Sequence, residues 1–308
     1  GFAEVVSDME FQHAKRIGVA SPRIFYNGPV KKNITVEQVC RGGGVVNIDS
    51  MHDLMLLEKI AAENPEFDFG VGIRCNFNVD DGVVSRFGID TGDSIFIECL
   101  SRVSACPNII LKGFQCHFAS RSRQAWENAA RGMIKVLEAF ETNGGDPDLL
   151  TFVSLGGGLY GPLADSLKAQ LDADAPTFEE YAEVAARPIA EYFASRGSSK
   201  PTLFLEPGTA VVANCIKYVC EVKGIKRIAG KSIAHVAGSS FNINGNARGI
   251  NLPLTVYSCE SVGDHYDCID FAGYTCVESD YLYKDYVGAV ATGDFIVLDS
   301  AGSYSIVM

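Results

Sequence analysis

Three consecutive glycines, Gly156, Gly157 and Gly158, follow the apolar segment 150–155 and precede a stretch rich in helix-forming residues. A turn without Cβ atoms after a buried strand lets backbone N–H groups close on a phosphate. The alternative is a tight strand-to-helix turn that binds nothing. We interpret the triplet as the binding turn for a phosphate-bearing cofactor.

Polar and glycine residues also stand where other apolar segments end. They are Ser7, Gly28, Asp49, Arg74, Asn76, His117, Glu206 and Gly208. The carboxyl ends of the parallel strands of a (β/α) barrel meet at one rim, where active sites lie. We therefore expect these residues to form one polar rim.

Seven short apolar segments, most followed by helical patterns, must position this rim. They span residues 3–7, 23–28, 45–49, 69–75, 109–117, 150–155 and 202–206. Strict alternation of strands and helices implies a parallel sheet with right-handed crossovers. A closed barrel needs eight strands. We predict an α/β fold, a (β/α)8 TIM barrel over residues 1–213, whose first strand and helix precede Gly1. An open doubly wound sheet is the alternative.

Helix start signals support this reading. Ser7 with Glu10, and Ser50 with Asp53, have the spacing of a capping box or its aspartate variant. Longer amphipathic segments span residues 120–143 and 177–195.

The sequence pattern changes after Ala213, where apolar residues no longer recur at helical spacing. Short segments rich in Val, Ile and Tyr, separated by Gly, Asn and Asp, predict strands. They span residues 217–224, 232–237, 254–259, 267–272, 294–299 and 303–308. We predict a C-terminal all-β domain over residues 214–308.

The overall composition limits the kinds of partner that we expect this protein to bind. The 308 residues carry a formal net charge of −12, and 47% of them are hydrophobic. An acidic surface argues against nucleic acid, and no apolar run reaches the roughly 18 residues that cross a bilayer. The ten cysteines form no CxxC pair. We expect reduced thiols, no metal site and a cytoplasmic protein.

Six motifs stand in a fixed order along the chain. They are Ser85-Arg86-Phe87-Gly88-Ile89, the segment 113–120, the glycine triplet, Glu206-Pro207-Gly208, Cys276 with Asp280, and Ala301-Gly302-Ser303-Tyr304. With these motifs the chain resembles the ornithine/diaminopimelate decarboxylase family. Members of that family are barrel-type pyridoxal 5'-phosphate (PLP) enzymes with a C-terminal β domain. The resemblance covers essentially all 308 residues.

The resemblance implies PLP as the cofactor and residues for both of its ends. Glu206 corresponds to the carboxylate that faces the ring nitrogen, and His117 to the histidine against the ring. The remaining cofactor-binding residues implied are Ser120, Gly156, Gly157, Gly158, Pro207, Gly208 and Tyr304. Structural alternatives stay open: a glutamate that caps a helix and a histidine satisfied at the rim.

The resemblance also implies a homodimer with shared active sites. Cys276 corresponds to a catalytic cysteine that directs protonation of the carbon losing carbon dioxide, and Asp280 reaches the neighbouring site with it. Glu278 and Thr209 are further substrate-facing candidates. A core cysteine beside a turn aspartate is the alternative.

The chain departs from the family pattern at several positions. The family's Schiff-base lysine lies on the first barrel strand, and no lysine of this chain stands in that context. Thr209 replaces an arginine that commonly binds a substrate carboxylate in two-pronged fashion, which threonine cannot do. Val277 replaces the acidic residue that usually follows the cysteine. Leu252-Pro253 and Val256 stand where an Arg-Pro and a tyrosine are expected.

These departures predict a PLP-dependent amino-acid decarboxylase that acts on an amino acid other than diaminopimelate. Polyamine, siderophore and natural-product precursors are the substrate classes that we expect. The absent lysine leaves two further possibilities, a truncated chain or a catalytically silent paralogue that binds a partner protein. An amino-acid racemase fits less well, because Glu206 would keep the ring nitrogen protonated.

Overall fold

The computed structural model describes residues 1–171, 175–197, 201–243, 249–258 and 263–305, which form two compact units. Within these ranges, unit 1 comprises Gly1–Gly158 and Phe178–Glu206, and unit 2 comprises Leu159–Thr177 and Pro207–Met308. The domain division predicted at residue 213 stays a prediction.

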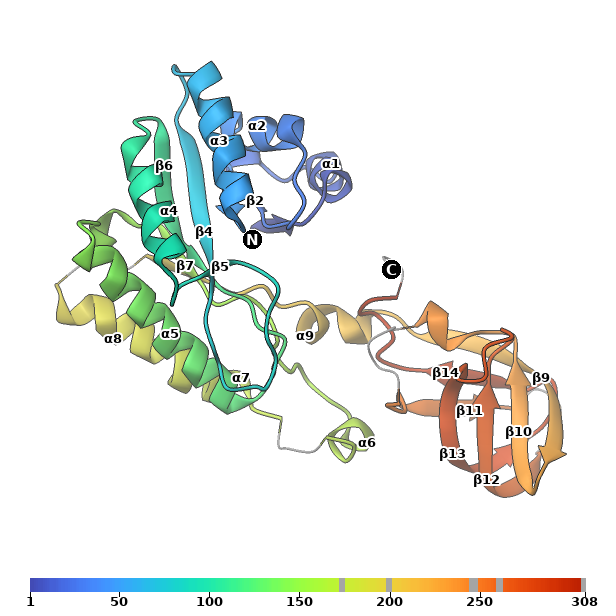
Figure 1. Cartoon of the computed structure of the whole chain (residues 1–308). Coiled ribbons are helices and arrows are strands. Elements are labelled where there is room, and N and C mark those ends of the chain that lie inside the picture. Colours follow the sequence, from blue (N-terminus) through green and yellow to red (C-terminus); the bar gives the residue numbers. More distant parts are fainter. Residues whose placement is uncertain (172–174, 198–200, 244–248, 259–262, 306–308) are drawn as a thin grey trace. The chain divides into compact units, whose positions relative to one another are not determined.

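Unit 1 is built on a curled parallel sheet whose strands follow one another in chain order (Figure 1). The order is β1 (Ala3–Val5), β2 (Ile24–Tyr26), β3 (Val45–Ile48), β4 (Phe69–Asn76), β6 (Ile109–Gln115), β7 (Phe152–Ser154) and β8 (Thr202–Phe204). All seven predicted strands are present, most of them shorter than expected. The two-residue strand β5 (Ile89–Asp90) pairs with β4 and was missed, because so short a segment has no periodicity.

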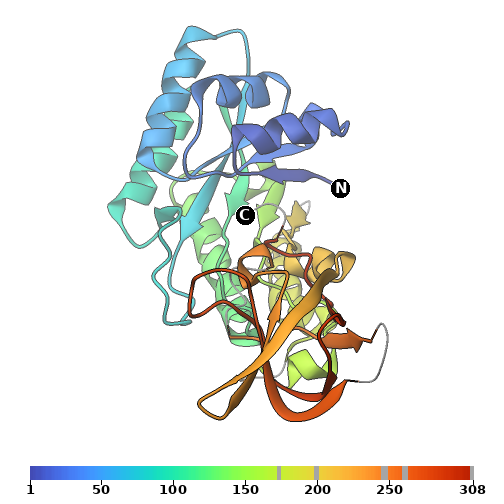
Figure 2. The same cartoon turned by 90° about the vertical axis from the view of Figure 1, so that its right-hand side faces the viewer.

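Helices cover the outer face of this sheet (Figures 1 and 2). They are α1 (Asp8–Arg16), α2 (Asn33–Arg41), α3 (Met51–Glu63), α4 (Ser94–Ala105), α5 (Arg123–Thr142), α7 (Phe178–Tyr181) and α8 (Arg187–Ser195). Short 3-10 turns lie at Ser21–Arg23 and Pro147–Leu149, and a π-helical turn at Ala182–Ala186 joins α7 to α8. Both predicted caps are confirmed: Ser7 accepts a hydrogen bond from the amide of Glu10, and Ser50 from that of Asp53.

Aromatic rings fill part of the inner face of the sheet. Phe2, Phe25, Phe152 and Phe204 contact one another with ring centroids between 4.7 and 5.7 Å apart. Side chains of a strand alternate between its two faces, so each residue two places further on shares the same face. An apolar layer therefore lies next to the level at which the strands end.

Unit 2 contains an antiparallel-rich sheet of six strands. Their order is β11 (Leu254–Tyr257), β14 (Phe295–Leu298), β9 (Tyr218–Ile228), β10 (Lys231–Val236), β12 (Asp264–Ala272) and β13 (Tyr281–Val290). The unit also holds α6 (Asp165–Lys168), α9 (Thr209–Val212) and 3-10 turns at Ala213–Cys215 and Ser240–Asn242. Buried aliphatic and aromatic side chains from all six strands, or packed against them, form its core.

Two sequence predictions for unit 2 differ from the structure. Strand β13 was missed, because Asp285 with φ +58° and Gly288 interrupt its pattern. The strand predicted over 303–308 is wrong at residues 303–305, which form a turn in which Tyr304 has φ +52°. Residues 306–308 lie outside the described ranges.

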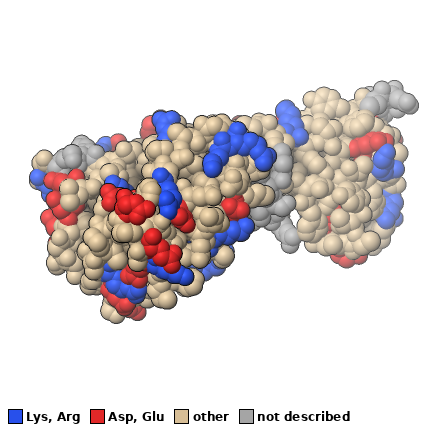
Figure 3. Space-filling model, turned by 90° about the horizontal axis from the view of Figure 1, so that it is seen from above, with Lys and Arg blue, Asp and Glu red and all other residues tan. Residues whose placement is uncertain are grey.

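On the face shown in Figure 3, acidic and basic side chains lie interspersed. Among the helices that the structure describes, none is long and apolar enough to span a membrane.

Candidate cofactor-binding site

The carboxylate of Glu206 is the centre of the rim in unit 1. It follows β8, and its side chain keeps 12% of its surface exposed. Oε1 accepts hydrogen bonds from Asn27 at 3.3 Å, Gln115 at 3.2 Å and Ser154 at 3.0 Å. Oε2 lies 3.0 Å from His117 Nδ1. A buried acceptor with this many donors is built to hold a negative charge.

The protonation state of Glu206 follows from these contacts. Burial opposes the charged form, but the hydrogen bond and charge of His117, with the donors Ser154 and Gln115, outweigh it. The pKa of Glu206 is therefore held below its ordinary value. The carboxylate is ionised at neutral pH and can hold a proton on a cationic ring nitrogen.

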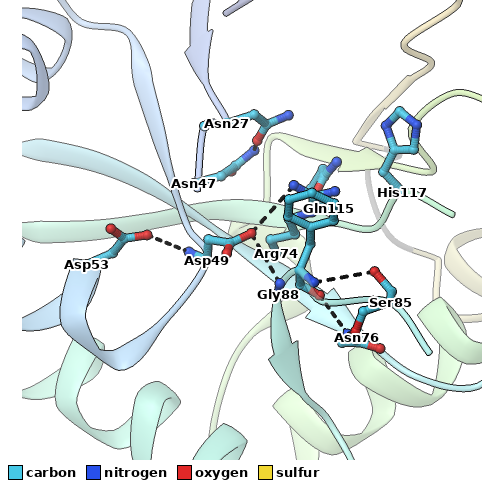
Figure 4. Close-up of polar contacts among 12 residues, drawn as sticks. Asn27, Asn47, Asp49, Asp53, Arg74, Asn76, Ser85, Gly88, Gln115 and His117 are labelled. Carbon is cyan, nitrogen blue, oxygen red and sulfur yellow. Dashed lines mark hydrogen bonds and ion pairs between the residues drawn. The ribbon is translucent and has the colours of Figure 1, made fainter. Parts of the chain in front are cut away.

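Buried amide side chains lie beside this carboxylate, and Figure 4 labels three of them, Asn27, Asn47 and Gln115. Asn47 donates a hydrogen bond to Asn27 Oδ1, and both residues are almost fully buried. A Cβ on Gly72 would lie 1.9 Å from Asn47 Oδ1, so the neighbouring strand makes room for the asparagine by having no side chain. The oxygens Asn47 Oδ1 and Gln115 Oε1 are buried without a partner among the described residues.

The strand periodicity explains why these groups meet. Four of the polar residues stand two places after an aromatic ring of the inner layer: Phe2 precedes Glu4, Phe25 precedes Asn27, Phe152 precedes Ser154 and Phe204 precedes Glu206. The two members of each pair face the same side of the sheet. Sequence reasoning missed Asn27, Asn47, Gln115 and Ser154, although a polar residue inside an otherwise apolar strand was the available signal.

The glycine triplet lies next to Glu206. Gly156 and Gly158 have φ +72° and +88°, and a Cβ on Gly157 would lie 2.5 Å from the Glu206 carbonyl oxygen. A Cβ on Gly158 would lie 2.9 Å from the carbonyl oxygen of Ser120. The amides of Gly157 and Gly158 make no hydrogen bond within the described part of the chain. The structure thus brings together the predicted residues Glu206, His117, Ser120 and the triplet.

Ser154 joins the triplet to the carboxylate. Its hydroxyl donates to Glu206 Oε1 at 3.0 Å and accepts the Gly156 amide at 3.2 Å. The turn is also held by Trp126, whose indole N–H donates to the Gly158 carbonyl at 3.0 Å. One hydroxyl therefore sets the position of the turn relative to the buried charge.

A second polar group lies along the same strand ends (Figure 4). Asp49 Oδ1 accepts the amide of Gly88 at 3.1 Å and lies 3.5 Å from Arg74 Nη1. The guanidinium of Arg74 is 4.4 Å from the centroid of the Phe87 ring. The motif Ser85–Ile89, which was recognised in the sequence, is thus tied to the rim by its backbone.

Glu4 adds a second carboxyl group on β1. Loss of hydration, followed by the negative charge of Glu206, raises the pKa of Glu4 to about 7. Two neighbouring carboxyl groups with pKa values driven apart can carry one negative charge and one proton. Sequence reasoning did not single out Glu4.

The other predicted residues belong to unit 2. Cys276 and Glu278 are exposed on the loop after β12, whereas Asp280 is 3% exposed. Both oxygens of Asp280 accept hydrogen bonds from the unit's own backbone and side chains, namely from Ser239, Ser240 and Thr275. In this structure Asp280 organises the loop that carries Cys276.

The predicted residues that directly follow Glu206, and Tyr304, also lie in unit 2. Pro207 and Gly208 precede the short helix α9, which begins at Thr209, and the Gly208 carbonyl accepts the amide of Val211 at 3.0 Å. Tyr304 is 44% exposed. The roles predicted for these residues stay predictions.

Comparisons with known proteins agree with the geometry of the rim. The family model described as "Pyridoxal-dependent decarboxylase, pyridoxal binding domain" matches residues 1–213. Diaminopimelate decarboxylase of Archaeoglobus fulgidus is 25% identical over 99% of this chain and 72% of its own length. Diaminopimelate decarboxylase of Haemophilus influenzae is 23% identical over 98% of this chain and 71% of its own length.

Solved structures support the fold. A crystal structure of diaminopimelate decarboxylase from M. jannaschii superposes with a TM-score of 0.84 at 23% identity, covering 99% of this chain and 70% of that one. The predicted barrel-type fold followed by an all-β region is confirmed by the curled parallel sheet and by this likeness.

One prediction is overturned. We expected a substrate other than diaminopimelate because Thr209, Leu252 and Val256 replace residues that contact it in the family. The relatives that match almost the whole chain are nevertheless named diaminopimelate decarboxylase, so that expectation is wrong. These single substitutions were weak evidence, because other side chains can take over contacts to a flexible substrate.

Proposed function

Because this chain belongs to the family of pyridoxal-dependent decarboxylases, we propose that it removes one carboxyl group from diaminopimelate and leaves lysine. The buried, ionised carboxylate of Glu206 beside the glycine turn, where the Gly157 and Gly158 amides make no hydrogen bond among the described residues, is the observation that carries the proposal. The names of the relatives support diaminopimelate as the substrate.

The residues of unit 1 fit PLP at both of its ends. When bound, PLP supplies an electron sink for the electrons released on loss of carbon dioxide. We assign Glu206 to hold the proton on the ring nitrogen, which keeps that sink strong. We assign the amides of Gly157 and Gly158, which make no hydrogen bond to any described residue, to the phosphate together with Ser120, and His117 to the face of the ring.

Residues of unit 2 complete the proposal. We assign the exposed thiol of Cys276 to deliver a proton to the carbon that loses the carboxyl group, and Tyr304 to donate its hydroxyl to the phosphate. Glu278 and Thr209 are proposed to face the substrate, and Asp280 to shape the loop. We further propose a homodimer in which this loop serves the neighbouring subunit. A cytoplasmic location stays a prediction.

Carbon dioxide release tests the function. Protein expressed from the complete reading frame is supplied with PLP and, in turn, diaminopimelate, ornithine, arginine and lysine. We expect carbon dioxide and lysine from diaminopimelate, and loss of kcat on the order of 10²-fold in Glu206→Gln. Faster carbon dioxide release from ornithine or arginine than from diaminopimelate would refute diaminopimelate as the substrate. No release from any amino acid would favour the non-catalytic alternative.

A further inference from the structure

The two oxygens of Glu206 are not equivalent. Oε1 accepts three donors, from Asn27, Gln115 and Ser154, at 3.0 to 3.3 Å. Oε2 accepts His117 at 3.0 Å and a longer contact from Gln115 at 3.3 Å. A carboxylate oxygen offers about two lone-pair directions. The Gln115 amide lies almost equally far from the two oxygens, so Oε1 has two donors of its own, Asn27 and Ser154, and Oε2 has one, His117. Oε1 is therefore saturated from within the sheet, whereas Oε2 keeps one accepting direction for a partner at the rim.

The donors that saturate Oε1 cannot easily move. Gln115 is 1% exposed, and Ser154 and Asn27 are each 3% exposed. The Gln115 amide has only one tolerable orientation, because the opposite one would set its oxygen against the carboxylate. In the observed orientation Gln115 Oε1 has no partner among the described residues. A buried acceptor left unpaired costs about 1–3 kcal/mol. We therefore attribute the presence of glutamine at position 115 to the hydrogen bond that its amide donates to Glu206, and not to the packing of its side chain.

Ser154 has a second contact that Gln115 lacks. Its hydroxyl accepts the Gly156 amide while it donates to Oε1. The distance between the glycine turn and the carboxylate is thereby fixed through one side chain. A ligand that contacts both must match that spacing.

We propose that Gln115 and Ser154 are positioning residues that hold the Glu206 carboxylate ionised and turned so that Oε2 receives the ring nitrogen of PLP. The inference rests on the proposed role of Glu206. It adds that Gln115 and Ser154 enable Glu206 to perform that role. Neither residue touches the substrate; both act through Glu206.

Other titratable groups face the same carboxylate from neighbouring elements. His117 follows β6, Glu4 lies on β1, and the thiol of Cys116 lies beside the site with its pKa raised by burial. Each of them can shift the pKa of Glu206. The test must therefore separate the effects of the Ser154 hydroxyl and the Gln115 amide from the effects of these charges.

Comparing the titration of the parent protein with that of single variants, all without PLP, provides that separation, because His117, Glu4 and Cys116 are present in each of them. The carboxyl carbon of Glu206 is followed by 13C NMR against pH, with Glu206→Gln identifying its signal. We expect Glu206 to titrate at higher pH in Gln115→Met and in Ser154→Ala than in the parent protein. Ser154→Thr keeps the hydroxyl and should restore the parent value. Gln124→Met, which removes an exposed glutamine of α5, is the control and should leave the titration unchanged.

Cofactor affinity gives a second, independent measurement. Trp126 is the single tryptophan of the chain and bonds to Gly158, so its fluorescence reports occupancy of the turn. We expect PLP to bind about tenfold more weakly to Gln115→Met and Ser154→Ala, as for the loss of one hydrogen bond to a charge. A PLP analogue with carbon in place of the ring nitrogen should bind the parent and Gln115→Met equally.

The outcomes separate the two proposals. If the parent binds PLP no better than the carbon analogue, the role of Glu206 in the proposed function fails. If Glu206 titrates alike in the parent, Gln115→Met and Ser154→Ala, the positioning role of Gln115 and Ser154 is refuted, whatever the affinity. Should Gln115→Met fail to fold, Ser154→Ala with its Ser154→Thr rescue decides the question.

Discussion

The ammonium group of Lys31 lies 2.7 Å from Asp53 Oδ2, and the lysine side chain is completely shielded from solvent. The same Asp53 oxygen accepts the amide of Asp49 at 3.0 Å. Asp49 in turn holds the amide of Gly88 and lies beside Arg74 (Figure 4). A buried ion pair outside the candidate cofactor-binding site thus fixes the backbone that presents Asp49 at the rim.

Lys31→Met is expected to destabilise the protein strongly. It leaves the Asp53 carboxylate buried without its counter-ion, which costs about 3–5 kcal/mol. Lys32→Met is the matched control, because Lys32 pairs with Asp8 with 68% of its side chain exposed. An exposed pair contributes about 0–1 kcal/mol. Urea unfolding of the two variants measures the difference, and equal losses would contradict the structural role given to Lys31.

Gly158→Ala is expected to weaken PLP binding beyond its effect on stability. Gly158 has φ +88°, and a Cβ there would lie 2.9 Å from the Ser120 carbonyl oxygen. Gly144→Ala is the control, since Gly144 has φ +84° and open space around the added Cβ. Both variants bear the left-handed strain of about 1–2 kcal/mol, but only Gly158→Ala crowds the turn. Fluorescence titration with PLP should therefore separate them, and equal affinities would argue against a phosphate at this turn.

Asp280 is expected to make folding of its unit sensitive to acid. Burial raises its pKa, but hydrogen bonds from Thr275, Ser240 and Ser239 outweigh burial and hold the pKa below the ordinary value. Such a carboxylate contributes stability at neutral pH, and this contribution is lost as pH falls through the folded-state pKa. Asp280→Asn should lose about 2–3 kcal/mol at neutral pH and show a flatter acid dependence in urea unfolding.

The reactivity of Cys276 provides a second measurement on the same variant. The loop that carries this thiol is held by Asp280 through Thr275. Asp280→Asn should therefore change the rate at which Cys276 reacts with a thiol reagent. An unchanged reaction rate together with an unchanged acid dependence of unfolding would contradict the claim that Asp280 organises the loop.

Much of the fold was predictable because its strands are short apolar runs that alternate with capped helices. The polar ring around Glu206 was predictable in principle too, since Glu4, Asn27 and Ser154 each follow an aromatic residue by two places. The contacts of Asp280 were not predictable. Its carboxylate is reached by Ser240 from 40 residues away, and which groups meet it depends on how two loops fold.

Glu4 is expected to give the stability of unit 1 an unusual pH dependence. Loss of hydration and the charge of Glu206 raise the pKa of Glu4 to about 7, although part of the residue is open to solvent on the edge strand β1. The folded state therefore binds the Glu4 proton more tightly than the unfolded state does. The free energy of unfolding should fall as pH rises from the ordinary glutamate value to about 7. Glu4→Gln should remove this slope, whereas Glu66→Gln, on an exposed loop, should keep it. Urea unfolding at several pH values measures both, and a slope that survives in Glu4→Gln would assign the dependence to another group.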